Sequence, residues 1–143
     1  MSTTAVDDVT AEEFAAVSTL YARYNQASND GSADSFADCF TEDATLVNAM
    51  AGLHLTGRDA MRAYKAKESA GRRDKYRRHW SGSLHLARQP DGSIAARSYL
   101  LVFGGEPGAL PEVIVAAVYE DRVVNIGGAW LYAQRTVLPD ARR

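Results

Sequence analysis

The stretch Arg78-His79-Trp80-Ser81-Gly82-Ser83-Leu84-His85-Leu86 decides the fold, because the hydrophobic period of the chain changes there from helical to alternating. After this stretch, turn residues divide the rest of the chain into three further strands, expected over 93–103, 113–121 and 128–137. Before it, apolar residues recur at helical intervals. Helices followed by a run of antiparallel strands predict an α+β fold, with the helices packed against one face of a strongly bent sheet.

The N-terminal half carries signals for the ends of its helices. Thr10 and Glu13 have the spacing of a capping box, and Gly31 supplies the backbone conformation that ends a helix. Thr56 and Asp59 repeat the capping-box spacing ahead of a helix that ends at Gly71. The expected elements are a helix to about residue 28, a short helix over 33–40, a turn at 41–43, strands at 44–48 and 53–55, the helix that ends at residue 71, and a basic loop at 72–78.

The composition fits one globular domain spanning residues 1–143, with tails at 1–9 and 139–143. The chain has 16 basic and 18 acidic side chains and a net charge of −2, which does not favour nucleic acid as a partner. The basic loop is expected to be solvated, and binding of a phosphate or carboxylate group is the alternative. We expect a cytoplasmic protein without membrane contact, because there is no signal peptide or long apolar run and Cys39 is the lone cysteine.

Several kinds of chemistry lack their sequence signature. No glycine-rich loop follows a strand and opens a helix, so a dinucleotide or phosphate-loop site is unsupported. No His, Cys and Asp cluster has metal-ligand spacing, and Cys39 lacks a plausible base. We therefore expect a reaction without a cofactor or a metal.

His79 is the main candidate for proton transfer, because imidazole titrates near neutral pH. Strict alternation would place His79, Ser81, Ser83 and His85 on one face of the strand and Trp80, Gly82, Leu84 and Leu86 on the other. A bulge would break this parity. If the polar set faces outward, His79 leaves the interior and the catalytic hypothesis fails.

Together these features resemble the SnoaL-like branch of the nuclear transport factor 2-like superfamily. The residues that carry the resemblance are 24–31, 40–44, 57–61, 78–80, 119–121 and 130–135. The resemblance implies a conical α+β barrel, in which three N-terminal helices pack on a strongly curved, mainly antiparallel sheet around a deep apolar pocket. It also implies a homodimer and a small hydrophobic ligand. This scaffold carries many functions, so the fold alone does not fix the activity.

The resemblance also implies roles for particular residues. In members similar to scytalone dehydratase, a histidine at the position of His79 is the general base, and a carboxylate orients it. The carboxylate position falls on Asn29, whose amide oxygen can fix the tautomer of an imidazole but cannot stabilise an imidazolium as a carboxylate does. Three interpretations of Asn29 stay open. The site performs an easy proton transfer on an activated carbonyl compound, it uses another carboxylate such as Asp30 or Asp34, or it binds a ligand without catalysis.

A tyrosine in this superfamily often donates a hydrogen bond to a substrate oxygen. Tyr24 is the first choice for this donor and Tyr99 the second. The side chains expected to contact the substrate are Tyr21, Tyr99, Ser81 and Trp130. For the three aromatic residues, packing of the ring in the core is the alternative.

The resulting hypothesis is a cofactor-independent acid–base enzyme that cyclises, isomerises or dehydrates a small hydrophobic cyclic or polyketide-like compound. One alternative is a binding protein of the same fold. Another is a structural small subunit like that of ring-hydroxylating dioxygenases.

Overall fold

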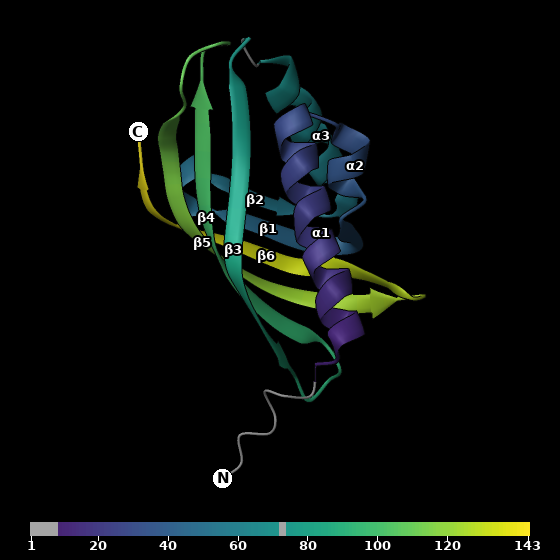
Figure 1. Ribbon diagram of the computed structural model, residues 1–143. Helices are drawn as coiled ribbons and strands as arrows, with labels where there is room; N and C mark the ends of the chain where they lie inside the picture. Colours follow the sequence, from purple (N-terminus) through teal and green to yellow (C-terminus); the bar gives the residue numbers. More distant parts are fainter. Residues whose placement is uncertain (1–8, 72–73) are drawn as a thin grey trace.

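The computed structural model describes residues 9–71 and 74–143 (Figure 1). The elements in chain order are α1 (Ala11–Asp30), α2 (Ala33–Ala37), β1 (Phe40–Asn48), β2 (Leu53–Thr56), α3 (Arg58–Ala70), β3 (Tyr76–Arg88), β4 (Ile94–Gly105), β5 (Glu112–Ile126) and β6 (Ala129–Arg142). A short 3-10 turn, Ala49–Ala51, joins β1 to β2. None of the described helices is long and apolar enough to cross a membrane.

The six strands form one curved sheet in the order β2-β1-β6-β5-β4-β3, and the three helices cover one of its faces (Figure 1). The β1–β6 pair is parallel and all the other pairs are antiparallel. The predicted α+β class is therefore confirmed, as is the mainly antiparallel sheet. The sheet is not closed into a barrel, because β2 and β3 are its two edges. The helices close the side that the sheet leaves open.

The ends of α1 form as the sequence predicts. The Thr10 side chain accepts a hydrogen bond from the Glu13 backbone N–H at 3.0 Å, and the Glu13 carboxylate accepts one from the Thr10 backbone N–H at 3.0 Å. Gly31 ends the helix in the left-handed region, with φ of 74°. The helix extends two residues beyond the expected end, so Asn29 lies in its last turn. The capping box predicted at Thr56 is wrong, since Thr56 belongs to β2 and α3 begins after Gly57 without a side-chain cap.

Several strands are longer than expected. Residues 41–43, predicted as a turn, lie within β1, and Tyr76 and Arg77, predicted as loop, pair with β4. Residues 139–142, predicted as a tail, continue β6, where Arg142 pairs with Val115 of β5. For the ends of β3 and β6, pairing with a neighbouring strand determines the structure, and the local sequence pattern does not report that pairing. Residues 1–8 of the expected N-terminal tail and Arg72 and Arg73 of the basic loop lie outside the described residues; Val9 packs against the core.

A charged residue lies at the centre of the core. Arg135 of β6 is fully buried, and its guanidinium donates to both carboxylate oxygens of Asp121 at 2.9 and 3.0 Å. Four tyrosine rings surround it, with centroids 3.5 to 4.8 Å from its central carbon: Tyr21, Tyr24, Tyr119 and Tyr132. Burial raises the pKa of Asp121, while the charge and hydrogen bonds of Arg135 oppose this rise. The carboxylate and the π faces together replace water around the cation.

Candidate active site

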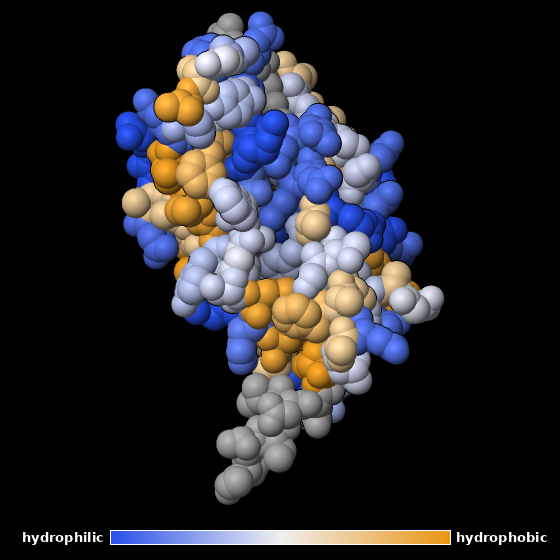
Figure 2. Space-filling model, in the orientation of Figure 1, coloured by the Kyte–Doolittle hydropathy of each residue, from blue (hydrophilic) through white to orange (hydrophobic). Residues whose placement is uncertain are grey.

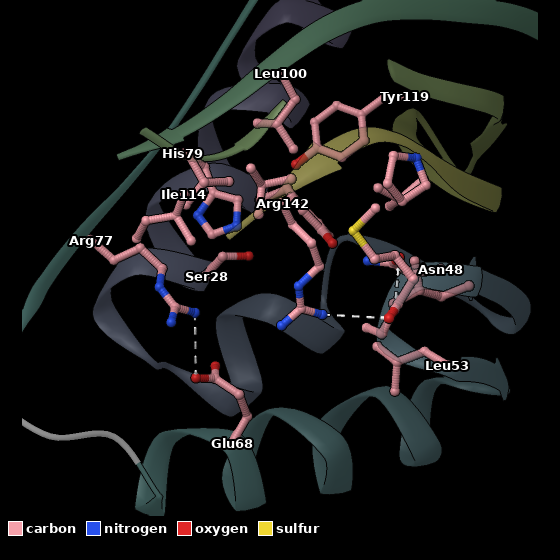
Figure 3. A pocket seen from close by; sticks show the side chains of 18 of the residues that line it. Ser28, Asn48, Leu53, Glu68, Arg77, His79, Leu100, Ile114, Tyr119 and Arg142 are labelled. Atoms are coloured by element: carbon pink, nitrogen blue, oxygen red, sulfur yellow. Dashed lines mark hydrogen bonds and ion pairs between the residues drawn. The ribbon is translucent and has the colours of Figure 1, made fainter. Parts of the chain in front are cut away.

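A cavity of about 230 Å³ opens between the helices and the sheet (Figure 3). This volume is slightly below the roughly 300–1,000 Å³ of most ligand sites, so it suits a compound of one or two rings. Its apolar wall comes from both layers and includes Tyr24, Phe36, Leu46, Tyr64, Leu100, Val102, Val115 and Tyr119.

His79 of β3 lines this cavity and is held by Asn29 of α1. The Asn29 amide oxygen lies 2.8 Å from Nδ1 of His79 and also accepts the His79 backbone N–H at 2.9 Å. Because the backbone N–H can only donate, the atom facing it must be the amide oxygen, and an amide oxygen can only accept from Nδ1. Nδ1 therefore carries a proton, and in the neutral imidazole Nε2 is the basic nitrogen. The dyad proposed from the sequence meets in space.

The spacing of α1 against β3 produces this pairing. Asn25, one helical turn before Asn29, donates to Ser81 Oγ at 2.9 Å, two residues beyond His79. Four helical residues span about 6 Å and two strand residues about 6.6 Å, so the Asn29–His79 and Asn25–Ser81 contacts form at matching intervals along the helix and the strand. The helix and the strand edge thus fix each other's register along this line.

A bulge at Ser83 sets which side chains of β3 face inward. Gly82 pairs with Tyr99 and His85 with Arg97, so Ser83 and Leu84 together oppose the single residue Ser98. Ser83 has φ of 57°, in the left-handed region. The parity changes here: His79 and Ser81 face the helices before the bulge, and Leu84 and Leu86 pack against the core after it. His85, expected on the same face as His79, is exposed on the opposite face.

Tyr24 lines the cavity, and its ring packs against Phe36, Phe40, Tyr119 and Tyr132. Burial raises its pKa to about 12, although the charge of Arg135 acts in the opposite direction. The phenol is therefore protonated at neutral pH and can donate a hydrogen bond. Tyr119 also lines the cavity, and its hydroxyl donates to the Asn25 amide oxygen at 3.4 Å.

Tyr21 and Ser81 border a second hollow, of about 310 Å³, between α1 and β3. Figure 2 shows the surface hollowed between these two elements, with hydrophilic side chains around the opening. His79 borders both this hollow and the first cavity. The Tyr21 hydroxyl donates to Asp121, and burial together with that carboxylate raises the pKa of the phenol. Tyr21 therefore supports the buried ion pair and does not line the first cavity.

Two predicted substrate contacts are wrong in the described structure. Tyr99 is 54% exposed on the outer face of β4, where its ring packs beside Arg97, so it lies on the side of the sheet away from the cavity. Trp130 is half-buried at the start of β6, with the Arg88 guanidinium 6.0 Å from its ring, and lines neither hollow. For Tyr99, strand parity, which the sequence pattern left open, decides the position; Trp130 packs against the core but lies at the start of β6, outside the cavity lining.

Neither carboxylate suggested as a replacement for Asn29 reaches His79. Asp30 is exposed, and Asp34 is exposed and forms an ion pair with Arg62 at 2.9 Å. His54 is exposed on β2. Cys39 is fully buried, and burial raises the pKa of its thiol to about 11, which makes it a poor nucleophile at neutral pH. Within the described ranges, no three His, Cys, Asp or Glu side chains are grouped to hold a metal ion.

The cavity is also lined by Lys65, Glu68, Arg77 and Arg142. The sequence did not single out Lys65, Glu68 or Arg142, and it considered Arg77 only as part of the basic loop, for which binding of a phosphate or carboxylate group was the alternative. Lys65 follows the buried Met61 by one helical turn, which is the pattern that could have placed it on the inner side of α3. Arg77 was assigned to a solvated loop and Arg142 to a tail. Their strands had to be known before either could be placed.

Comparison with known proteins agrees with this architecture. ActVI-ORFA from Streptomyces coelicolor has a TM-score of 0.81 and 27% sequence identity, over 89% of this chain and 96% of that one. A Catenulispora acidiphila protein in complex with S-DNPA has a TM-score of 0.79 and 27% identity, over 92% and 96%. A Nostoc punctiforme protein with a cystatin-like fold, at 22% identity, a TM-score of 0.77 and coverage of 92% and 94%, shows the shared fold alone.

None of the curated proteins is significantly similar to the chain. The model of the SnoaL-like domain family matches residues 9–136, which include all three helices, His79 and most of the sheet. The chain therefore belongs to the SnoaL-like domain family.

Proposed function

We propose that this protein is a cofactor-independent acid–base enzyme that cyclises, isomerises or dehydrates a small hydrophobic cyclic compound. The observation that carries the proposal is the 2.8 Å contact between Nδ1 of His79 and the Asn29 amide oxygen at the wall of an apolar cavity. This contact holds the imidazole in the tautomer whose Nε2 can accept a proton. A histidine with only a structural role would not need to line this cavity.

In the proposed reaction, Nε2 of His79 removes a proton from the carbon next to a substrate carbonyl. The electron pair of that C–H bond moves toward the carbonyl oxygen, which becomes enolate-like and accepts a hydrogen bond from Tyr24. The imidazolium then returns the proton, either to another carbon or to a departing hydroxyl group. Isomerisation and dehydration follow from these two alternatives.

The helix that carries Asn29 offers a partial substitute for the absent carboxylate. His79 lies against the last turn of α1, where the helix dipole places partial negative charge and no basic side chain is present. Such a position stabilises a histidinium by about 0.3–1 kcal/mol at an exposed site and up to about 2 kcal/mol when partly buried. This supports transfer of a proton from an activated carbonyl compound, the first of the three interpretations of Asn29.

The comparisons support a small molecule as the partner. A structural neighbour of 27% identity has been solved with the small molecule S-DNPA bound. In this chain the cavity combines an apolar wall with polar side chains that include Ser28 and His79, and such a combination is usual for small-molecule sites.

We also propose that the protein is a homodimer that pairs through the outer face of its sheet. Five apolar side chains on β3 to β6 of that face are at least 41% exposed: Trp80, Tyr99, Leu101, Val113 and Leu138. Figure 2 shows hydrophobic side chains gathered over the upper parts of β4 and β5. A second copy of the chain would remove this surface from water.

Exchange of the activated C1 protons of 2-tetralone in D₂O, followed by NMR, tests the catalytic role of His79. The His79→Ala variant is expected to slow enzyme-dependent exchange by about 100-fold or more, which is the usual contribution of a positioned base. The matched control is His85→Ala, because His85 is on the same strand but exposed on the opposite face. Exchange that survives in His79→Ala would overturn the acid–base mechanism. Binding of 2-tetralone by the wild type without any exchange would favour the binding protein.

A further inference from the structure

The cavity carries an excess of positive charge. Among its described lining residues, three are cationic, namely Lys65 of α3, Arg77 of β3 and Arg142 of β6, and one is a carboxylate, Glu68 of α3. Figure 3 shows Arg77 and Arg142 entering the cavity from different strands, with His79 and Ser28 between them. Charge in a partly enclosed, mostly apolar cavity acts more strongly than on an open surface.

Glu68 is shared between two of these cations. Its carboxylate lies 2.8 Å from Nζ of Lys65 and 3.8 Å from a guanidinium nitrogen of Arg77. The Lys65 side chain is only 5% exposed, and its ammonium also lies 4.7 Å from the centre of the Phe36 ring. Among the described residues, this carboxylate therefore contacts two cations, and the ring face supplies part of the stabilisation that water would give Lys65.

Arg142 adds a third positive charge at the mouth. Its Nη1 donates to the Met50 backbone carbonyl at 3.4 Å, a neutral acceptor that leaves the charge uncompensated. The guanidinium group is planar and carries five N–H donors, so one carbonyl uses a small part of its capacity. A fork of this kind suits the two oxygens of a carboxylate.

We infer that the substrate is an aryl carboxylate. Its ring would lie against Leu100, Val102 and Tyr119, and its carboxylate would lie at the mouth between Arg77 and Arg142. The inference rests on the proposed function in taking this cavity as the substrate site. It adds that an anionic group, and not the apolar wall alone, orients the compound relative to His79. The same positive field favours an enolate, since negative charge develops in the cavity during proton removal.

Binding of 2-naphthylacetate and 2-naphthylacetamide, measured by isothermal titration calorimetry at low and high salt, tests the inference. The two probes have the same ring and nearly the same shape, and they differ in charge. The wild type is expected to bind the carboxylate about tenfold more tightly than the amide at low salt, and less so at high salt. Arg77→Gln and Arg142→Gln are each expected to reduce this preference about threefold or more. Arg122→Gln, on β5 and outside the cavity lining, is the control and keeps the preference.

Arg142→Lys keeps the charge but loses the planar fork, and an intermediate preference in this variant supports bidentate recognition. Circular dichroism of each variant establishes that a lost preference is not a lost fold. Three results would overturn the inference. The wild type binds the two probes with equal affinity, the preference for the carboxylate survives in the Arg77→Gln/Arg142→Gln double variant, or neither probe binds at millimolar concentration. The His79→Ala variant separates this inference from the proposed function. If it still prefers 2-naphthylacetate to 2-naphthylacetamide and exchanges 2-tetralone protons at the wild-type rate, the proposed catalysis is overturned and this inference stands.

Discussion

Asn29 sets the chemical limit of the site, because its amide oxygen accepts two hydrogen bonds from His79 yet carries no charge. Asn29→Asp keeps both acceptor positions and adds the charge that stabilises an imidazolium. We expect exchange of 2-tetralone protons to become about tenfold faster or more. The reverse change, from aspartate to asparagine in a serine protease, slows catalysis roughly 10⁴-fold, so the expected gain is smaller than that loss. The acid limb of the pH–rate profile is expected to shift to higher pH. Asn29→Leu, which loses both acceptor positions, is the control and slows exchange. An Asn29→Asp profile identical to that of the wild type contradicts the orienting role.

Tyr24 is the side chain we expect to polarise the substrate carbonyl. Tyr24→Phe removes the hydroxyl and keeps the ring that packs on Phe36 and Phe40, so the free energy of unfolding should change little. The exchange rate at saturating 2-tetralone should fall about 100-fold, as for other single donors to a developing oxyanion. Because burial raises the pKa of Tyr24 to about 12, its loss of a proton should not limit the wild-type rate below about pH 11. Tyr99→Phe is the control, and equal rates for the two variants would remove Tyr24 from the mechanism.

At the level of single residues, the sequence could pair His79 with Asn29, because a family resemblance supplies that relation. It could not place Tyr99, because β4 is apolar on both faces. Leu100 and Val102 are buried, while Tyr99 and Leu101 are exposed, and the alternation that normally distinguishes the two faces is missing. It also could not locate Arg135, whose burial depends on Asp121 and on tyrosine rings from α1, β5 and its own strand.

At the level of elements, the bulge at Ser83 determines which side chains of β3 reach the cavity. A left-handed conformation costs an L-residue roughly 1–2 kcal/mol, and a β-branched residue tolerates it poorly. Ser83→Val is therefore expected to lower the free energy of unfolding by about 1 kcal/mol or more, and Ser83→Gly to leave it equal or raise it. Urea denaturation measures both. Gln134→Val, at an exposed position of β6 in extended conformation, is the control and should change stability little. A Ser83→Val protein as stable as the wild type would contradict the role of this φ angle.

The ends of α1 were predictable from the sequence and several strand ends were not, for a physical reason. The Thr10–Glu13 box and Gly31 satisfy the backbone groups of their own helix, so the signal lies within a few residues. The ends of β3 and β6 depend on partners far away in sequence, such as Gly105 for Tyr76 and Val115 for Arg142. Two of the strand ends that were missed carry Arg77 and Arg142, so these two residues were not placed at the cavity.

At the level of the whole molecule, the outer face of the sheet has an apolar surface that the single chain leaves in water. Trp80 pairs with Leu101 across β3 and β4, and both are exposed, at 72% and 41%. If the proposed dimer uses this face, the wild type should elute as a dimer in size-exclusion chromatography with light scattering. The Trp80→Glu/Leu101→Glu variant should be a monomer, because pairing would bury two like charges from each copy in one interface.

The fold of that variant should survive, because neither side chain belongs to the buried core of the single chain. Leu110→Glu is the matched control: Leu110 is 90% exposed and apolar but lies in the β4–β5 connection, so its replacement should leave the dimer intact. A wild-type monomer at tens of micromolar, or a dimer that persists in the double variant, would contradict pairing through the sheet. Dimerisation would also explain the position of Tyr99: its ring would serve the interface of two copies, on the opposite side of the sheet from the cavity where His79 lies.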